Sequence, residues 1–288
     1  MIAHKERKEE CTVRSKHLLS IMVFVSILMT TLLSSPVHAI TNGQPDGNAH
    51  PYVGWVVIWD NASDYVYIGS GSLIASDVVL TAGHMTADMP DYIIKYVWVS
   101  FDPEAVWSPL SHPEEWNVAE SWHTHPEYEI GEAPQLKDWI THDVGIIILE
   151  EPVSVGTHGE LPTEGLVDTL GMRETVDQVG YGVQTRVLVP GAGPPFWDYI
   201  DFGVRYYAPA ELVKSKHVFS DEFIKLTANP AKGKGGTAFG DSGGPNLLGG
   251  TNTILGVTSW GTNYPCGGVS YVQRIDTADV RNWIIGFL

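Results

Sequence analysis

Short apolar runs, each too short for a typical helix, dominate this sequence and are separated by glycine, proline, asparagine and aspartate. Ten of them, rich in Val, Ile, Tyr and Trp, cover residues 52–58, 65–74, 78–81, 93–101, 144–149, 176–183, 199–207, 224–227, 254–260 and 269–275. Such runs predict β-strands, and many of them together predict barrels or a sandwich. Helical spacing is clear only in residues 277–287, and a second short helix is expected near 208–214. We therefore expect an all-β fold.

The N-terminus has the organisation of a secretory signal. Basic residues come first, and residues 18–33 then form an apolar stretch that ends before a small residue, Ala39. The stretch is short for a membrane span, which needs about 20 residues. We expect residues 1–39 to be a cleaved signal peptide and the protein to be secreted and extracellular, with an uncleaved anchor as the alternative.

Charge and cysteine content narrow the class of function. The chain has 17 basic and 34 acidic residues, a net charge of −17, and cleavage after Ala39 would leave a net charge of −19. This acidic balance argues against nucleic-acid partners and against anionic membrane surfaces. Cys11 would leave with the signal and Cys266 would stay alone, so no internal disulfide is possible. We expect a monomer without a cofactor, whose core holds the fold without cross-links.

Three motifs carry groups for nucleophilic catalysis. Ser242 lies in a glycine-rich segment, Gly-Asp-Ser-Gly-Gly-Pro, over residues 240–245. His84 follows a predicted strand in Thr-Ala-Gly-His, and Asp143 directly precedes another. A serine hydroxyl is a weak nucleophile until a base takes its proton, and an acid orients that base. The three residues are therefore the candidate catalytic triad.

The order of these residues along the chain separates the known arrangements. Residues 240–244 also match Gly-x-Ser-x-Gly, but that elbow needs a histidine after the serine, and the last histidine is His217. In another known arrangement the aspartate precedes the histidine. The aspartates that could serve in it lack the strong strand context of Asp143. Those candidates are Asp46, Asp60, Asp64 and Asp77. The order histidine, aspartate, serine remains.

With these motifs the chain resembles the chymotrypsin/trypsin-like family of secreted serine peptidases over residues 40–288. Residues 40–43 are similar to the mature N-terminus of that family, 125–128 to a segment before its aspartate, and 259–261 to its substrate-pairing strand. The resemblance implies two antiparallel six-stranded β-barrels with a C-terminal helix. Residues 40–158 would form the first barrel, with His84 and Asp143. Residues 159–288 would form the second, with Ser242, and the terminal helix.

The resemblance also implies a role for each residue. Ser242 would attack the peptide carbonyl, His84 would transfer its proton, and Asp143 would hold the histidine. Backbone N–H groups of Gly240 and Ser242 would form the oxyanion hole. The substrate backbone would pair with Ser259, Trp260 and Gly261 as an added strand. The expected partners are protein or peptide substrates.

The specificity pocket implied by the resemblance carries no charge. Its base would be Gly236, followed by Thr237, and its walls would include Gly261 and Gly268. An open, uncharged pocket favours large apolar or aromatic side chains before the scissile bond. Two nearby lysines, Lys232 and Lys234, would instead favour acidic substrates if they faced the pocket.

Activation in the family depends on a new N-terminus that pairs with the aspartate before the nucleophile. Here those residues are Ile40 and Asp241. The predicted signal cleavage site lies directly before Ile40, so we expect signal peptidase itself to generate the active N-terminus. The alternative is cleavage near Ser34 followed by trimming.

The chain departs from the family at its cysteines. Met85 and Gly69 occupy two positions that are usually a disulfide pair, and Ala238 replaces the usual partner of Cys266. The open alternatives for function are a catalytically silent binding protein and an esterase with the same triad.

Candidate metal ligands and a modification motif are also present. The histidines that could suggest a metal site are His112, His123, His125 and His142, and the acidic residues that could hold calcium are Asp102, Glu104, Glu114 and Glu115. Neither set has a complete ligand cluster in the sequence, so we expect no metal. Residues 61–63 form a glycosylation sequon.

Overall fold

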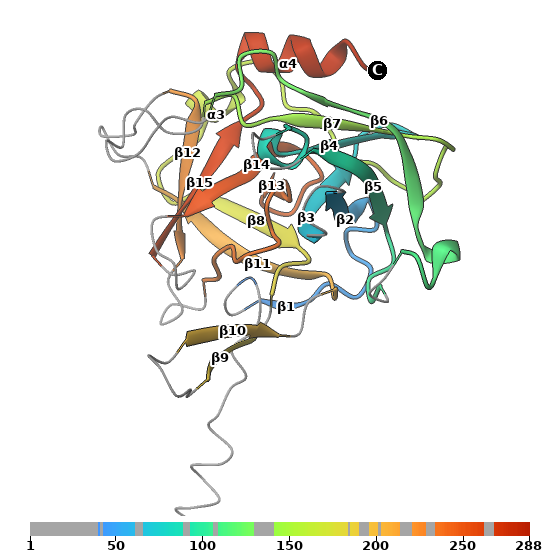
Figure 1. The fold of residues 1–288 in the computed structure, drawn as a ribbon. Coiled ribbons are helices and arrows are strands. Elements are labelled where there is room, and N and C mark those ends of the chain that lie inside the picture. The colour runs from blue at the N-terminus through green and yellow to red at the C-terminus, as the bar shows by residue number, and fades with distance from the viewer. Residues whose placement is uncertain are drawn as a thin grey trace, which may run out of the picture. The chain divides into compact units, whose positions relative to one another are not determined.

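The computed structural model describes residues 40, 43–60, 66–88, 93–105, 109–129, 141–183, 185–189, 196–200, 203–213, 221–228, 234–261 and 268–288. Residues 37–288 form one compact unit. Its strands are arranged in two barrels, and a C-terminal helix ends the chain (Figure 1). Cys266 and the sequon at 61–63 lie outside the described residues.

The first barrel is closed by six antiparallel strands in the order β2-β3-β4-β7-β6-β5. Their bounds are β2 Val53–Asp60, β3 Val66–Leu73, β4 Val78–Thr81, β5 Ile94–Ser100, β6 Asn117–Thr124 and β7 Gly145–Leu149. The central strands are buried along nearly their whole length, which is why they appear in the sequence as continuous apolar runs. The pairing of β4 with β7 places Thr81 opposite Gly145.

The second barrel is closed in the same way, by β8, β11, β12, β15, β14 and β13 in ring order. Their bounds are β8 Thr175–Gly180, β11 Tyr206–Leu212, β12 Phe223–Ala228, β13 Pro245–Leu248, β14 Ile254–Gly261 and β15 Gly268–Arg274. A short strand, β1 Gln44–Pro45, adds to β11, and the hairpin strands β9 Thr185–Val189 and β10 Phe196–Ile200 pair with each other. The predicted fold of two six-stranded barrels is confirmed.

Within the described residues, helical structure is limited to short segments. Besides the turns η1 Gly83–Met85 and η2 Pro113–Glu115, it comprises α3 Leu166–Thr169 and α4 Ala278–Ile285. The terminal helix was predicted, and Thr277 occupies its N-cap position. The helix predicted near 208–214 is wrong, because residues 208–212 belong to β11, which pairs with β8. Among the described residues, no helix has the length and hydropathy needed to cross a membrane.

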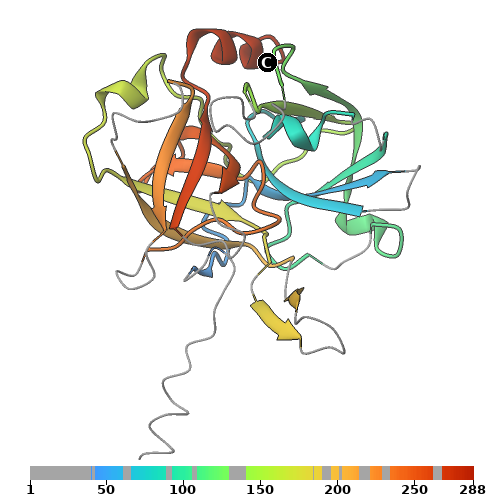
Figure 2. The same ribbon diagram turned by 60° about the vertical axis from the view of Figure 1, so that its left-hand side comes forward.

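One hydrophobic cluster is shared by the two barrels, and a second lies among the strands of the second barrel and α3. Buried residues of the first barrel, such as Val56, pack in the same cluster as Val179 and Val257 of the second. The helix α4 follows the second barrel but packs back on the first: Phe287 contacts His123 of β6, with ring centroids 5.0 Å apart. Figure 2 shows α4 at the end of the chain, above the strands of both barrels. This shared core packs the two barrels against each other.

A buried ion pair ties the N-terminal segment to both barrels. Arg205, which is fully buried, donates from Nε to Asp46 at 2.8 Å. Its other nitrogens donate to the carbonyl of Val53, the hydroxyl of Tyr181 and the side chain of Asn48. Because every charged atom has a partner, the pair can be buried without leaving an unsatisfied charge. No described cysteine is available to cross-link the same segments.

Candidate active site

His84 and Asp143 meet because β4 and β7 are neighbours. His84 lies in the turn η1, three residues after β4, and Asp143 lies two residues before β7. The His84 ring Nδ1 lies 2.9 Å from Oδ2 of Asp143, and the His84 backbone N–H donates to Oδ1 at 2.8 Å. The carboxylate therefore holds both the backbone and the ring of the histidine.

Asp143 is fully buried and has further partners. The hydroxyl of Ser259 donates to Oδ2 at 2.5 Å, and the backbone N–H of Asp143 donates to Oε1 of Gln273 at 3.0 Å. Burial alone would raise the pKa of Asp143, but His84 and Ser259 lower it below its ordinary value. Sequence reasoning assigned Ser259 to substrate binding and missed Gln273, because no local sequence pattern indicates that either residue contacts Asp143.

The His84 ring is positioned to accept a proton. Its side chain is 24% exposed, so a substrate can approach it. Burial would lower the pKa of His84, but the charge and hydrogen bond of Asp143 outweigh it and raise the pKa above 6.5. Because Nδ1 faces the carboxylate, Nε2 is the nitrogen that can exchange a proton with a reacting group.

The loop that carries Ser242 packs against the segment before His84. Gly243 has φ +79°, and a Cβ there would lie 2.0 Å from Oγ1 of Thr81 and 2.7 Å from the backbone nitrogen of Ala82. Only glycine allows both this conformation and this close approach. The Ser242 carbonyl also accepts a hydrogen bond from the N–H of Ser70 at 2.7 Å. Tertiary packing thus brings the half-buried Ser242 beside η1.

Two backbone donors lie at this serine. Neither the Gly240 N–H nor the Ser242 N–H makes a hydrogen bond to any residue that the structure describes. The following N–H groups, by contrast, are used within the fold: Gly243 donates to Thr258 and Gly244 to Asp241. The two unused donors are therefore available to an oxygen atom of a ligand.

Asp241 is buried beneath the serine loop, only 1% exposed. It accepts hydrogen bonds from the backbone N–H groups of Gly182 at 2.9 Å, Ala238 at 2.7 Å and Ile40. Burial raises the pKa of its carboxyl to about 6, although these donors lower it in part. Ile40 is itself fully buried. The structure thus brings together the two residues that sequence analysis paired.

A family model described as Trypsin matches residues 42–284, which is most of the chain. The chain belongs to the trypsin family. No curated protein matches it in a sequence search.

Solved structures agree with this family in fold. HL collagenase superposes with a TM-score of 0.62 at 19% identity, over 85% of this chain and 96% of its own. Human heparin binding protein gives 0.57 at 16% identity, over 85% and 94%. A thermostable serine protease from an extremophilic microorganism gives 0.56 at 16% identity, over 82% and 95%. At such low identity the likeness concerns the fold alone.

The region of the predicted specificity pocket contains one residue that sequence analysis missed. Gly236 is buried, and the hydroxyl of Thr237 lies 2.9 Å from the hydroxyl of Ser270, a residue of β15 paired with Gly261. Gly268 begins the same strand. The position of Ser270 at this region could have been predicted only from the pairing register of β14 and β15. A sequence does not show strand register.

The structure describes only one of the two lysines near this region. Lys234 pairs with Glu211, with 3.6 Å between Nζ and Oε1. Lys232 lies outside the described residues. The Lys234 charge is thus partly neutralised by a residue of the second barrel.

Met85 fills the space where many members of the trypsin family have a disulfide. It is 4% exposed, and a Cβ on Gly69 would lie 2.5 Å from its Cε and 2.9 Å from its Sδ. The same Cβ would lie 2.9 Å from the Ser242 carbonyl oxygen. The thioether thus packs in the gap between η1 and β3, beside the serine loop.

Shortening this side chain should therefore be costly. We expect Met85→Ala to lower the free energy of unfolding by about 2–5 kcal/mol, because it opens a cavity in the shared core. The matched variant Met85→Leu keeps most of the volume and should cost less than about 1.5 kcal/mol. Urea unfolding of both variants measures the two changes in the free energy of unfolding. Equal losses would contradict the role of the Met85 side chain in filling this space.

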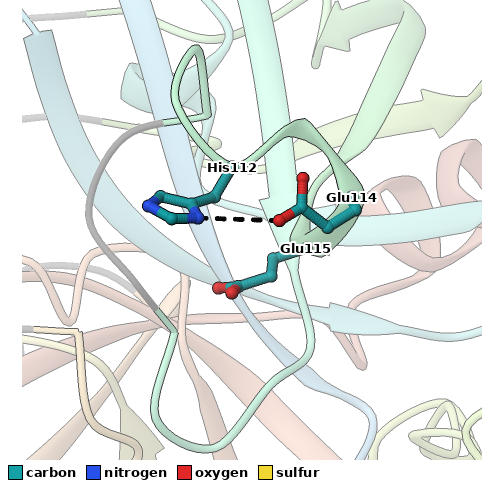
Figure 3. A group of neighbouring side chains, drawn as sticks. All are labelled: His112, Glu114 and Glu115. Carbon is teal, nitrogen blue, oxygen red and sulfur yellow. Dashed lines mark ion pairs between the residues drawn. The ribbon is translucent and has the colours of Figure 1, made fainter.

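The candidate metal ligands do not gather as one site. Among the described residues, close groups of ligand atoms comprise His112 with Glu114 and Glu115, and Glu127 with His142 and Asp279. Figure 3 shows the first group, whose side chains all come from the turn around η2. His123 instead contacts Ser121 and Phe287, and neither Asp102 nor Glu104 belongs to a group.

Proposed function

We propose that the chain is a secreted serine endopeptidase that cleaves peptide bonds through an acyl-enzyme. The observation that carries this proposal is the buried Asp143 carboxylate, which holds His84 by ring and backbone, directly beside the loop of Ser242. Membership of the trypsin family supports the same activity. Residues 40–158 and 159–288 are the proposed domains, each with one barrel.

In the first half of the proposed reaction, Ser242 Oγ attacks the carbonyl carbon of the scissile bond. His84 Nε2 takes the hydroxyl proton as the carbon–oxygen bond forms, and Asp143 stabilises the resulting imidazolium. The carbonyl oxygen becomes an oxyanion, which the N–H groups of Gly240 and Ser242 would stabilise; one such donor contributes about 3–4 kcal/mol in comparable enzymes.

The intermediate then collapses. The carbon–nitrogen bond breaks as His84 gives its proton to the leaving amine, and Ser242 remains as an ester of the substrate acyl group. Water attacks this ester with the same histidine as base, releasing the carboxylic acid and restoring the serine. The substrate backbone would lie along Ser259, Trp260 and Gly261 in this proposal.

Large apolar side chains are the proposed preference before the scissile bond. Thr237 and Ser270 hydrogen-bond to each other, which leaves neither hydroxyl unsatisfied beside an apolar substrate group. The pairing of Lys234 with Glu211 argues against a preference for acidic residues. Gly236 and Thr237 provide no carboxylate that would pair with a Lys or Arg side chain of the substrate.

A panel of peptide amides tests both activity and preference. We expect the chain that starts at Ile40 to cleave peptides with Phe, Tyr or Leu before the scissile bond, and those with Lys, Arg, Asp or Glu at least about tenfold more slowly in kcat/KM. A tenfold difference corresponds to about 1.4 kcal/mol of transition-state stabilisation. Chromatography of the products gives the cleavage site.

Other outcomes would separate the alternatives. Best cleavage after Lys or Arg would overturn the apolar preference. Ester hydrolysis without amide cleavage would indicate an esterase. Absence of both, in folded protein with a confirmed Ile40 N-terminus, would indicate a silent binding protein; the acidic net charge argues against a polyanion such as heparin as its ligand.

Secretion and activation form one proposed sequence of events. We infer that signal peptidase cleaves before Ile40 and frees the amine that pairs with Asp241. Support comes from the buried Ile40, whose backbone N–H already donates to the Asp241 carboxylate.

A further inference from the structure

A second group of chemically active side chains lies at the start of α4, outside the proposed triad. Nε2 of His142 lies 3.0 Å from Oδ2 of Asp279 and 3.4 Å from Oε2 of Glu127. The ligand atoms of these three residues lie within 4.8 Å of one another. We propose that His142, Glu127 and Asp279 bind a zinc ion.

The spacing of these atoms suits a tetrahedral metal. Zinc binds imidazole nitrogen and carboxylate oxygen at about 2.0–2.2 Å, so neighbouring ligand atoms of a tetrahedral site lie about 3.3–3.6 Å apart. The observed 3.0 and 3.4 Å from Nε2 of His142 to the two carboxylates need adjustments of only a few tenths of an ångström, and all three ligand atoms lie within 4.8 Å of one another. The Glu127 side chain is 68% exposed, so it can make this adjustment.

The donor set selects the kind of metal. One imidazole nitrogen with two carboxylates favours zinc, whereas calcium takes six to eight oxygen ligands and magnesium an octahedron of oxygens. Three protein ligands leave a fourth position for water. A divalent ion would also offset two carboxylates that converge on a single imidazole.

The His142 ring is held in place before any metal arrives. It is 14% exposed and stacks on the buried ring of His125, with centroids 4.9 Å apart and planes 13° from parallel. His125 in turn packs edge-on against Trp283 of α4 at 5.0 Å. This stack fixes the direction of Nε2 toward the two carboxylates, which lowers the ordering cost of binding.

The other ring nitrogen of His142 sets the affinity. Nδ1 of His142 is buried without a hydrogen-bond partner among the described residues. A metal-bound ring would therefore lack the acceptor that usually supports such ligands, and we expect micromolar rather than nanomolar binding.

The group at η2 provides an internal control. His112, Glu114 and Glu115 come from one exposed turn (Figure 3). The proposed zinc ligands come from three segments: the turn after β6, the residue before Asp143 and the first turn of α4. The His112 Nδ1 lies 3.6 Å from Oε1 of Glu114, and the two side chains are 44% and 70% exposed. This turn lacks the three-segment arrangement of the proposed zinc site.

Calorimetric titration of the metal-free chain with zinc chloride tests the proposal. We expect one equivalent to bind, with no comparable binding of calcium or magnesium. Asp279→Asn and Glu127→Gln should each weaken zinc binding at least tenfold, since loss of a direct ligand costs no less than loss of an outer-shell partner. Glu114→Gln at the control group should leave the affinity unchanged.

Thermal unfolding keeps the test independent of catalysis and of folding defects. Both variants replace exposed or half-exposed carboxylates with amides of similar size, so they should fold, and zinc should raise Tm of the parent chain but not of Asp279→Asn. Absence of zinc binding, or binding that only Glu114→Gln reduces, would overturn the site. Because neither measurement uses a peptide substrate, the result stands apart from the proposed peptidase activity.

Discussion

Replacing Ser242 by alanine is expected to lower kcat for peptide amides by about 10⁴- to 10⁶-fold while leaving the fold intact. The loss should be this large because the residues of a triad act as a unit, so the remaining His84 and Asp143 have no nucleophile to activate. The residual rate would reflect substrate positioning and the N–H groups of Gly240 and Ser242, whose backbone the substitution retains.

The control for this experiment removes a hydroxyl elsewhere. Ser76 is an exposed serine in the turn before β4, so Ser76→Ala should leave kcat unchanged. Steady-state rates on a peptide amide, with circular dichroism to check folding, give the comparison. A Ser242→Ala variant that keeps more than a tenth of the activity would remove Ser242 from the mechanism.

A free amine at Ile40 is expected to decide between an active and a nearly inactive enzyme. A chain that starts at Ile40 should exceed one that retains Ala39 by about 10²–10³ in kcat, because the pairing with Asp241 supports the loop that presents the Gly240 and Ser242 donors, and loss of one oxyanion donor costs about that much. The matched pair differs by one residue, and its rates on the same peptide amide give the comparison.

The same pair of chains should differ in stability in a pH-dependent way. Without the amine, the Asp241 pKa rises from 3.8 to about 6 on folding, so the free energy of unfolding falls as pH rises from about 4 through 6. This shift corresponds to about 3 kcal/mol. In the chain that starts at Ile40 an ammonium group offsets the carboxylate, so its stability should be retained to about pH 8, where an ordinary amine loses its proton.

Urea unfolding of both chains at pH 4, 6 and 7.5 measures this difference. The two free energies should agree at pH 4 and separate at pH 7.5, with the Ile40 chain the more stable. Equal stability at pH 7.5 together with equal activity would contradict the proposed activation. Asp241→Asn in the longer chain should abolish the fall in stability, since it removes the titrating group.

Some of the secondary structure was predictable because strands buried on both sides leave a continuous apolar run. The predicted run 78–81 coincides with β4, and 254–260 differs from β14 by one residue. The run 199–207 is wrong as a single strand, because it spans the end of β10, Gly203 at φ +91° and the start of β11. Strand β6 was not among the ten predicted runs, since its polar and half-exposed residues form no continuous apolar run.

The candidate site was predictable where local sequence carries the signal. Histidine, aspartate and serine each stand beside a strand or among glycines, and their order along the chain excludes other arrangements of the same groups. The contact between His84 and Asp143 was expected from the resemblance to the chymotrypsin/trypsin-like family, and the structure places their side chains 2.9 Å apart. The structure places Ser242 beside η1 because Gly243 packs closely against Thr81 and Ala82. The sequence shows Gly243 only as a glycine and does not indicate this packing.

By itself, the sequence predicted an all-β fold and the order of the reactive residues, because apolar runs and motif order are local properties. Only the tertiary structure decided that Ser259 holds Asp143, that Arg205 joins Asp46 to both barrels, and that His142 faces Asp279. These contacts join residues more than a hundred positions apart. They depend on strand register and on the shared core, which no local pattern encodes.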